Sequence, residues 1–277
     1  MNNLRLPSPA NPLELTERQF TAICRLVHGQ CGVNLKGKRE LVKARLAKRL
    51  RSLGMTDFGQ YLELVGRDAS GGELNTLIDA LTTNKTGFFR ENQHFDFLRR
   101  KVLPGLQADE ARLWSAGCSS GEEAYSLAIL VSEALETDTL RRARILATDI
   151  STRMVARARR ATYTAEELRG LQPHYREGYF RKVADQPHPA YQVRENVRTL
   201  VSVGRLNLVD HWPMKGPFDV VFCRNVMIYF DKETQHQLVH RLREILKPGG
   251  LLFVGHSESL AGLGAELRYI RPAVYQR

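Results

Sequence analysis

The chain has 277 residues, 43% of them hydrophobic, which is enough for one large or two small domains. A formal net charge of +11 indicates an acidic partner: a nucleic acid, an anionic membrane or an acidic protein surface. No apolar run approaches the ~18 residues that would span a bilayer. The four cysteines are far apart and lack paired spacing, which argues against a metal or disulfide framework and favours a reducing cytoplasm.

The first part of the chain is expected to be helical. Residues 1–15 are rich in Pro and Asn without an apolar core, which predicts a disordered leader rather than a signal peptide. Thr16 and Gln19 have the spacing of a capping box, and apolar residues then recur at helical spacing up to Val27. Further helical patterns cover residues 38–53, 57–65 and 72–81. The first of these has an apolar stripe of Val42, Leu46, Leu50 and Leu53.

The helix expected over residues 38–53 is strongly basic. Eight Lys or Arg residues between positions 36 and 51 face a single acid, Glu40. The candidates for partner docking in this run are Lys43, Arg45, Lys48, Arg49 and Arg51. Such a charge run is usually a solvated helix face. The alternative is a docking face for an acidic helix or a phosphate backbone, and the residues alone leave both interpretations open.

Residues 82–90 read Thr-Thr-Asn-Lys-Thr-Gly-Phe-Phe-Arg, and their period fits neither a helix nor a strand. A plain linker would not need Phe88 and Phe89, since large aromatic side chains favour burial. The segment is therefore either a linker that packs over the mouth of the next domain or a hinge whose aromatics enter the core. A helix over residues 93–103 follows, and Pro104-Gly105 ends it.

Residues 112–128 indicate a buried strand, a tight turn and a helix. Gly117 and Gly121 bracket Cys-Ser-Ser, which lets the backbone turn sharply and a ligand approach it. This arrangement puts free backbone N–H groups and a helix N-terminus at the carboxyl edge of a sheet, where α/β folds bind nucleotide-like ligands. A second strand ends at Asp149, whose carboxylate could accept both ribose hydroxyls, although a lone Asp there is most often a helix cap. Another helix is expected to follow, with Ser151 as its N-cap.

The rest of the chain alternates strand and helix patterns about five times, which favours a doubly wound α/β sheet. The clearest buried strand is Phe218–Cys223. Residues 267–270 and 274–276 are expected to form a terminal antiparallel pair.

Residues 164–191 interrupt this alternation. A short helix over 165–168 and a hairpin that pairs 178–183 with 191–194 are expected there. An insertion before the next strand would stand over the carboxyl edge of the sheet, either as a partner-binding flap or as a plain surface excursion.

The residues alone limit the chemistry. No Ser/His/Asp or Cys/His set is evident, and the histidines lack metal-ligand spacing, so no metal is expected. The phosphate-loop NTPase signature is absent, and Gly117-Cys-Ser-Ser-Gly121 is not a dinucleotide fingerprint. An adenosine-type cofactor in a Rossmann-like domain is the interpretation that remains.

Five separate motifs follow one another along the chain. They are Thr-Thr-Asn-Lys-Thr-Gly-Phe-Phe-Arg-Glu91, Trp-Ser-Ala-Gly-Cys-Ser-Ser-Gly-Glu-Glu-Ala-Tyr-Ser-Leu-Ala128, Ala-Thr-Asp-Ile150, Phe-Cys-Arg-Asn-Val-Met-Ile-Tyr-Phe230, and Lys-Pro-Gly-Gly250 with Gly-His-Ser-Glu258. In this order they closely resemble the CheR family, the chemotaxis receptor glutamate methyltransferases. The resemblance covers nearly the whole chain after Thr16.

The resemblance implies methyl transfer from S-adenosylmethionine (SAM) to glutamate side chains of chemoreceptors, giving γ-methyl esters and S-adenosylhomocysteine. It implies an all-α domain over residues 16–81, a linker over 82–91 that contributes to the active site, and a Rossmann-like SAM-dependent methyltransferase domain over 92–277. A small antiparallel β-subdomain would be inserted at about residues 171–196. The protein would act in chemotaxis signalling as a cytoplasmic monomer.

Residue roles follow from the resemblance, motif by motif. The cofactor-binding residues would be Asn84, Thr86, Arg90, Gly117, Glu123, Asp149, Asn207, Leu208, Cys223 and Arg224. Arg90 and Tyr229 would be catalytic and would point at the reacting carboxylate. Because a glutamate is already ionised at pH 7, it needs no general base, and catalysis reduces to aligning carboxylate oxygen, methyl carbon and sulfur.

The same resemblance implies two partner surfaces. The basic helix would dock on the acidic helical bundle of a receptor. The hairpin would grip a pentapeptide tether at a receptor's C-terminus, as it does in some members. Tether-binding members often carry Gly-x-Gly in the hairpin turn, whereas residues 181–189 here read Arg-Lys-Val-Ala-Asp-Gln-Pro-His-Pro, so the turn does not support tether binding.

Two alternatives from other functional classes stay open at this point. A SAM-dependent RNA methyltransferase would suit the net charge of +11, although the chain lacks an evident catalytic Cys motif or Asn/Asp-Pro-Pro-Tyr/Phe signature. Steep salt dependence of RNA affinity would favour it. A non-catalytic adaptor would bind SAM or a receptor without turnover, and the presence of Arg90, Asp149 and Tyr229 argues against it.

Overall fold

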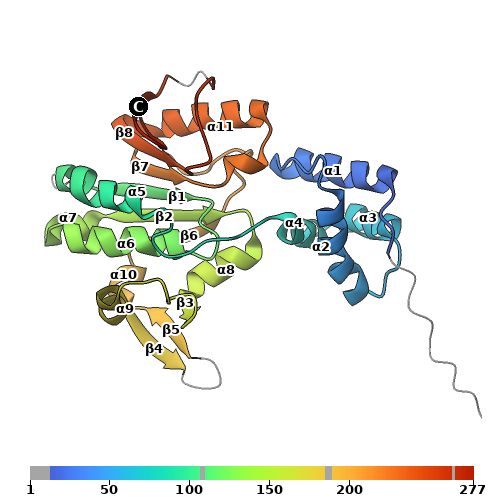
Figure 1. The fold of residues 1–277 in the computed structure, drawn as a ribbon, viewed down its shortest axis with the longest axis horizontal. Helices are drawn as coiled ribbons and strands as arrows, with labels where there is room; N and C mark the ends of the chain where they lie inside the picture. Colours follow the sequence, from blue (N-terminus) through green and yellow to red (C-terminus); the bar gives the residue numbers. More distant parts are fainter. Residues whose placement is uncertain (1–12, 107–109, 185–188, 264–265) are drawn as a thin grey trace, which may run out of the picture. The chain divides into compact units, whose positions relative to one another are not determined.

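A computed structural model describes residues 13–106, 110–184, 189–263 and 266–277. Contacts divide the chain into two compact units, Met1–Thr82 and Thr83–Arg277, which are described separately (Figure 1). Residues 1–12 of the expected leader lie outside the described residues, whereas Leu15 is buried. Within the described residues, no helix has both the length and the apolar character needed to cross a membrane.

The first unit consists of helices. They are α1 (Glu17–Cys31), α2 (Arg39–Ser52), α3 (Phe58–Arg67) and α4 (Gly72–Leu81). The predicted capping box is present, because Thr16 accepts from the Gln19 backbone N–H while the Gln19 side chain accepts from the Thr16 backbone N–H. The predicted apolar stripe of α2 is also confirmed, since Val42, Leu46 and Leu50 are fully buried.

The second unit is built on a seven-stranded sheet with the order β6-β2-β1-β7-β8-β10-β9. The strands are β1 (Arg112–Ala116), β2 (Arg144–Asp149), β6 (Val201–Arg205), β7 (Phe218–Cys223), β8 (Leu246–Val254), β9 (Arg268–Arg271) and β10 (Val274–Gln276). Neighbours from β6 to β8 run parallel, and β10 pairs antiparallel with β8 and β9. The predicted α/β sheet and terminal antiparallel pair are confirmed. The carboxyl ends of five parallel strands therefore share one edge.

Helices and short helical turns connect these strands. They are α5 (Asn92–Phe97), a π-helical turn (Leu98–Val102), a 3₁₀ turn (Leu103–Leu106), α6 (Glu122–Ala134), α7 (Thr137–Arg142), α8 (Thr152–Arg160), α9 (Pro173–Tyr179), α10 (Glu195–Arg198), a 3₁₀ turn (Met227–Tyr229) and α11 (Lys232–Ile245). The predicted N-cap of α8 is confirmed, because Ser151 accepts from the Met154 N–H at 3.2 Å.

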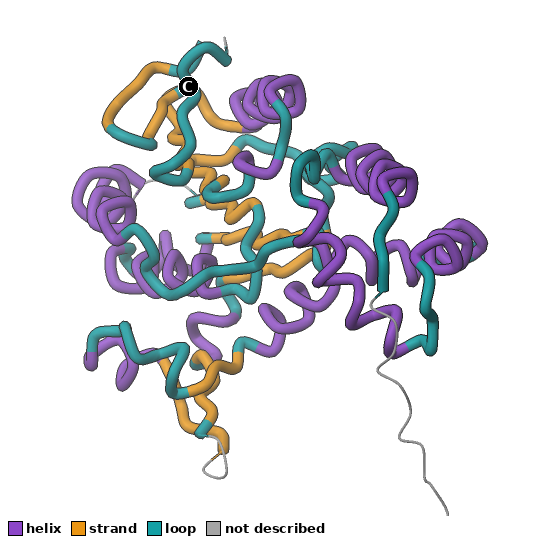
Figure 2. The backbone as a smooth tube through the Cα atoms, turned by 45° about the vertical axis from the view of Figure 1, so that its right-hand side comes forward, coloured by secondary structure: helices purple, strands orange, loops and turns teal. Residues whose placement is uncertain are grey.

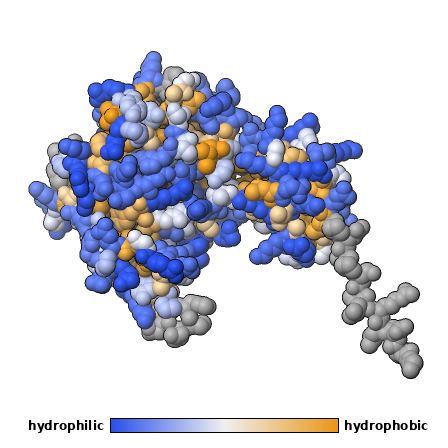
Figure 3. All heavy atoms as spheres, in the orientation of Figure 1, coloured by the Kyte–Doolittle hydropathy of each residue, from blue (hydrophilic) through white to orange (hydrophobic). Residues whose placement is uncertain are grey.

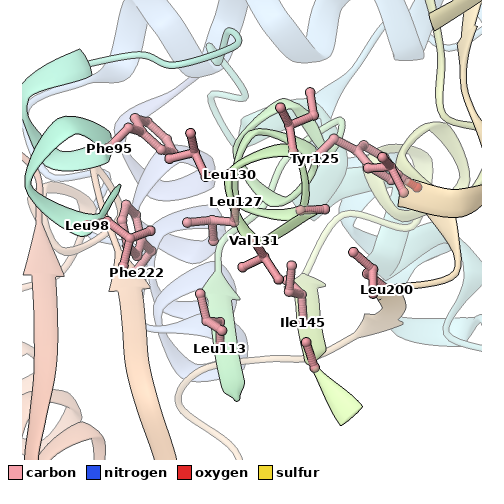
Figure 4. Packing of buried hydrophobic residues seen from close by; sticks show 14 of the residues in the cluster. Phe95, Leu98, Leu113, Tyr125, Leu127, Leu130, Val131, Ile145, Leu200 and Phe222 are labelled. Carbon is pink, nitrogen blue, oxygen red and sulfur yellow. The ribbon is translucent and has the colours of Figure 1, made fainter. Parts of the chain in front are cut away.

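Helix α6 lies at the centre of the larger hydrophobic core, and Figure 4 shows its side chains reaching toward neighbouring elements. Leu127 and Val131 pack toward the sheet residues Leu113 and Ile145, while Leu130 lies near Phe95 (Figure 4). Burial of each such side chain stabilises the fold by roughly 1.5–3 kcal/mol. A second cluster packs α11 against β7 and β8 through residues such as Leu242, Val221 and Leu252. The α6 packing anchors the helix whose first turn borders the candidate site.

A separate three-stranded sheet interrupts the alternation, in the order β3 (Thr162–Thr164), β5 (Ala190–Val193), β4 (Phe180–Ala184) (Figures 1 and 2). All its pairs are antiparallel, which confirms the inserted β-subdomain and its hairpin. The hairpin turn at residues 185–188 lies outside the described residues. The helix expected over 165–168 is wrong. Hydrogen-bonded turns occupy these positions, because the Leu168 N–H donates four residues back to Thr164 O, whereas the Arg169 and Leu171 N–H groups donate only three residues back, to Glu166 O and Leu168 O.

Candidate active site

The turn between β1 and α6 holds two glycines that no other residue could replace. Gly117 has φ 90°, and a Cβ there would lie 2.4 Å from Val226 Cγ2. Gly121 has φ 101°, and a Cβ there would lie 3.0 Å from the Tyr163 hydroxyl. At both positions a side chain is disfavoured for two reasons: the backbone is left-handed, and a neighbouring side chain occupies the space where a Cβ would lie. The turn is consequently packed against residues far away in the sequence.

The expectation of free backbone N–H groups in this turn is corrected by the structure. Gly117 and Cys118 both donate to Thr148 O, at 2.8 and 2.9 Å. The Ser119 N–H donates to Asp149 Oδ2 at 2.8 Å. These donors are used inside the protein because the turn folds back onto the end of β2. A ligand at this edge would therefore meet the shape of the turn and the acid of β2 rather than unpaired donors.

Asp149 ends β2 beside the glycine turn, and it is buried. Its two carboxylate oxygens each accept one backbone N–H, Oδ2 from Ser119 and Oδ1 from Ser151 (2.9 Å). The carboxylate thus caps the turn on one side and the start of α8 on the other. A carboxylate offers about four lone-pair sites, so this kind of group can accept hydroxyl donors as well as backbone N–H groups.

Arg224 follows β7 directly and lies in a buried ionic network. Its Nη1 donates to Glu123 Oε2 at 3.0 Å, and its Nη2 donates to Glu91 Oε2 at 2.9 Å. The same Nη2 donates to the backbone carbonyl of Arg90 at 2.5 Å. The Arg224 side chain is only 2% exposed, and Ser115 donates to Glu123 Oε1 at 2.6 Å. One guanidinium therefore joins β1, β7, α6 and the segment that carries Arg90.

Protonation in this network follows from burial and charge. Burial alone would raise the pKa of Glu91, but Arg224 and Asn225 together hold this pKa below its ordinary value. Burial raises the pKa of Glu123, and the Arg224 cation opposes that shift. Burial, followed by the charge of Arg224, lowers the pKa of His94 to about 3, so its imidazole is neutral at pH 7.

Residues 83–91 begin the second unit and pack against the rest of it. The Phe88 ring lies 4.9 Å from that of Tyr163, and the Phe89 ring stacks on Tyr175 at 4.8 Å. Both aromatics thus enter the edge of the core, as the hinge interpretation expects. The Phe89 N–H donates to Ser126 Oγ at 3.0 Å, and Ser119 Oγ donates to the Asn84 carbonyl at 3.0 Å. These contacts place the segment against the glycine turn and the first turns of α6.

The predicted residues of this segment are all half-buried, and these are Asn84, Thr86 and Arg90. The Arg90 guanidinium is tied to its own segment, because its Nη1 donates to Lys85 O at 2.7 Å. Tyr229 is half-buried at the end of the 3₁₀ turn after β7. Arg90 and Tyr229 thus belong to the two segments that Arg224 and Asn225 link through Glu91.

The remaining predicted cofactor residues lie at or just beyond the ends of β6 and β7. Asn207 makes local contacts, with Nδ2 donating to Asp210 Oδ2 at 2.9 Å. Leu208 is buried, and its carbonyl accepts from Arg241 at 2.9 Å. The Cys223 side chain is fully buried in the core on the α11 face, and burial raises the pKa of its thiol well above the usual range. These residues share the carboxyl edge of the sheet with Asp149.

The predicted docking residues of α2 divide into two groups. Arg49 pairs with the buried Glu73, and Arg45 donates to the carbonyls of Leu81 and Thr82 at the end of α4. Lys48 and Arg51 are exposed, and Lys43 is half-buried. The first group thus stabilises the helical unit itself. The second group is at least partly open to solvent. Figure 3 shows hydrophilic residues over much of the face in view, with hydrophobic patches between them.

Two carboxylates of the site have no predicted role from the sequence, Glu91 and Glu258. Both belong to motifs that carry the family resemblance, and that membership is the signal that could have drawn attention to them. Glu91 receives Arg224, Asn225 and the backbone N–H of His256. Glu258 receives three backbone N–H groups from the ends of β7 and β8.

Among the described residues, one group has metal-ligand geometry, since Glu91, His94 and His256 offer ligand atoms within 4.8 Å of one another. Glu91 Oε2 already accepts from Arg224 at 2.9 Å and from the His256 backbone N–H at 3.3 Å. A cation there would compete with an internal cation for the same oxygen. The ion pair with Arg224 accounts for the position of Glu91.

Comparisons with known proteins identify the family. The all-alpha domain of CheR methyltransferases matches residues 18–82, and their SAM-binding domain matches residues 84–274. Chemotaxis protein methyltransferases of Escherichia coli and Salmonella typhimurium are 41% and 40% identical, covering 91% and 95% of this chain and 87% and 91% of theirs. That of Borreliella burgdorferi is 36% identical over 96% of both chains.

These matches confirm the resemblance, the fold class and the SAM cofactor, and they do not favour the RNA methyltransferase or adaptor alternatives. The chain belongs to the CheR methyltransferase family and is a SAM-dependent methyltransferase of chemotaxis.

Proposed function

We propose that this protein transfers the methyl group of SAM to glutamate side chains of chemoreceptors, giving γ-methyl esters and S-adenosylhomocysteine. The observation that carries the proposal is the meeting of three features in one unit. These are the glycine turn, the buried Asp149 carboxylate beside it, and the segment that brings Arg90 against that turn. The names of the relatives, chemotaxis protein methyltransferases, supply the substrate class.

The residues at the sheet edge fit an adenosine-type cofactor. The Asp149 carboxylate would accept the two ribose hydroxyls, while its contacts with the Ser119 and Ser151 N–H groups hold it in place. Gly117 lets the turn pack closely against Val226, where a side chain would collide. The other residues that would surround the cofactor are Asn84, Thr86, Arg90, Glu123, Asn207, Leu208, Cys223 and Arg224. Among them, Arg224 would act through Glu123 and the Arg90 backbone, because its side chain is buried and engaged there.

Bound SAM supplies a methyl group on a sulfonium, which is a good leaving group. The protein has to orient the attacking carboxylate, since a glutamate is already ionised at pH 7 and needs no base. Arg90 and Tyr229 would provide a cation and a hydroxyl for this purpose. Arg90 is restrained by Lys85 O, which limits how fully it can pair with the nucleophile. A tighter pairing would stabilise the ground-state carboxylate and slow its attack.

The substrate partner would be the acidic helical bundle of a receptor, docked on α2. Lys48 and Arg51 are exposed on that helix, and Lys43 is half-buried beside them. Arg45 and Arg49 would add positive potential while they support the fold. The helical residues 16–81 would then serve docking, residues 82–91 would link the two functions, and residues 92–277 would carry out transfer in the cytoplasm as a monomer.

The inserted subdomain, at about residues 171–196, is the second candidate partner surface. The β4–β5 hairpin offers an exposed strand, because Arg181, Lys182 and Val183 are all exposed. A C-terminal receptor tether could add to such an edge by strand pairing. The turn sequence without Gly-x-Gly does not support this, so direct docking on α2 is proposed as the main contact.

The test is transfer of labelled methyl from SAM to purified receptor cytoplasmic domains. Asp149→Ala serves as the cofactor-site control, and bulk RNA as the substrate control. Base-labile label on the receptor that disappears in the variant is the expected result. Label on RNA and none on any receptor would overturn the proposal.

A further inference from the structure

The motif Gly255-His-Ser-Glu258 has no part in the function proposed above. Glu258 lies just beyond β8 and is only 8% exposed. Its carboxylate accepts three backbone N–H groups: Gly255 to Oε2 at 2.6 Å, Asn225 to Oε2 at 2.8 Å and Ile228 to Oε1 at 3.2 Å. Two of these donors, Asn225 and Ile228, belong to the loop after β7. Glu258 therefore connects its own motif after β8 to a different motif after β7.

The loop that Glu258 holds has little conformational freedom of its own. Asn225 adopts φ 57°, a left-handed conformation that is uncommon for a residue with a side chain. A Cβ at Gly255 would lie 2.4 Å from the Asn225 side chain and 2.9 Å from the Asn225 backbone nitrogen. The ends of β7 and β8 therefore approach closely, and the carboxylate bridges them. Without this acceptor, the two loop N–H groups would lose their partner in a partly buried site.

Tyr229 is the residue directly after Ile228 in this loop. Its backbone N–H donates to Val226 O at 3.2 Å, and Phe230 N–H donates to Met227 O at 3.0 Å, which closes the 3₁₀ turn. Glu258 accepts from the Asn225 and Ile228 N–H groups on one side of this turn, and Gln235 Nε2 donates to the carbonyls of Met227 (2.8 Å) and Phe230 (3.1 Å) on the other. We propose that Glu258 is a positioning residue, which fixes the 225–229 loop so that the Tyr229 hydroxyl is held at the reacting carboxylate.

This inference rests on the proposed role of Tyr229 and extends it to a residue that touches neither substrate nor cofactor. The cofactor side of the site has further anchors that Glu258 does not supply, since Arg224 is fixed by Glu91, Glu123 and the Arg90 carbonyl, and it meets the 225–229 loop through the Asn225 side chain on Glu91. Loss of the Glu258 contacts would therefore move Tyr229 more than the cofactor residues. A displacement of about 1 Å at a reacting group can slow a reaction about 100-fold.

The experiment compares Glu258→Gln, Tyr229→Phe and the double variant of the full chain, with receptor cytoplasmic domains as substrate. We expect each single variant to lower kcat about 10- to 100-fold, with the Kd for S-adenosylhomocysteine within about threefold of wild type. The double variant should be no slower than the slower single variant, because both changes remove the same oriented hydroxyl. Glu258→Asp should restore part of kcat, since it keeps the charge but shortens the reach.

A matched control separates positioning from general stability. Asp68→Asn removes the charge from another carboxylate that accepts backbone N–H groups, from Ser70 at 3.0 Å and Glu73 at 2.7 Å, in the first unit. It should lower the melting temperature without changing kcat. Thermal melts of all variants show whether they fold, and Glu258→Asp replaces Glu258→Gln if the latter unfolds.

Other outcomes would overturn the inference in distinguishable ways. Multiplicative losses in the double variant, or equal losses of cofactor affinity and kcat, would make Glu258 a purely structural residue. An unchanged kcat in Glu258→Gln, with active wild type and a slow Tyr229→Phe, would refute the inference alone. Absence of receptor methylation by wild type, or full activity of Tyr229→Phe, would refute the proposed function on which it rests.

Discussion

Arg224 of the second unit and Arg51 of the first are used in opposite ways. In the second unit, Arg224 is buried and paired with two carboxylates, so its charge holds elements of the same unit together. In the first unit, Arg51 on α2 is exposed, as is Lys48. A buried cation must be paired to exist at all, whereas an exposed one contributes little to stability and keeps its charge for a partner. Burial therefore separates charges that are used in internal ion pairs from charges that remain at the surface, although both look alike in the sequence.

The largest test of this contrast is Arg224→Met. The change leaves Glu91 and Glu123 facing each other in a buried site without their cation. We expect the free energy of unfolding to fall by about 3–5 kcal/mol, as for other broken buried pairs. Urea unfolding of the full chain measures it. Arg67→Met, which removes an exposed pair with Glu63, should change stability by no more than about 0.5 kcal/mol; equal effects of the two variants would refute the contrast.

A second test uses pH and His94, which lies 1% exposed near Arg224. The pKa of His94 is about 3 in the folded state, below the ~6.5 of an unfolded chain, so the unfolded state takes up the proton first as the pH falls. The contribution of His94 to the free energy of unfolding is therefore fully present above about pH 6.5. Below that pH the free energy of unfolding falls, and at pH 5 it is lower by about 2 kcal/mol.

His94→Leu should remove that part of the difference in unfolding free energy between pH 7 and pH 5. Neither ring nitrogen of His94 has a hydrogen-bond partner within the part of the chain that the structure describes. The substitution should therefore lower the free energy of unfolding at pH 7 only slightly. The exposed His211 provides the control, and His211→Gln should keep the wild-type pH dependence. An unaltered dependence in His94→Leu would show that His94 does not carry it.

The third test concerns docking. Replacing Lys43, Lys48 and Arg51 together by Ala should raise the KM for receptor about tenfold and leave the KM for SAM unchanged. Added salt should raise the wild-type KM toward that of the variant, because exposed charges are screened. The charge-reducing surface change Arg268→Ala on β9 is the control. A kcat loss without any change in the receptor KM would argue against docking through α2.

The smallest expected effect is in the helix cap of the first unit. Thr16→Ala removes the capping-box acceptor of α1 and should lower stability by about 1 kcal/mol. Thr16→Ser keeps the hydroxyl and should stay near wild type. Chemical denaturation with helical and tertiary probes measures both. Methyl transfer should be unaffected, since Thr16 stabilises α1 and is neither a predicted cofactor residue nor a predicted docking residue.

Local patterns predicted the parts of the molecule that depend on near neighbours. The capping box at Thr16, the α2 stripe, the strand Phe218–Cys223 and the N-cap at Ser151 all rest on contacts within a few residues. The motif order further indicated the sheet and the SAM domain. The residue roles in binding and catalysis remain predictions for the experiments above.

The contacts that organise the site could not be predicted in the same way. Glu91 meets Arg224 across 133 positions, and Glu258 meets Asn225 across 33. Such pairs form only after the parallel strands bring their carboxyl ends together, so no local sequence pattern predicts them. The predicted free N–H groups of the glycine turn were wrong for a related reason, since Thr148 and Asp149 of the neighbouring strand take up these donors.

The packing of Phe88 and Phe89 has an evolutionary consequence. These rings pack with Tyr163, Tyr175 and their neighbours, so residues 83–91 are part of the second unit while the boundary falls at Thr82. A recombination event at that boundary would exchange the helical unit and leave Arg90 in place. Receptor preference could then diversify by gene fusion while the transfer chemistry is inherited intact.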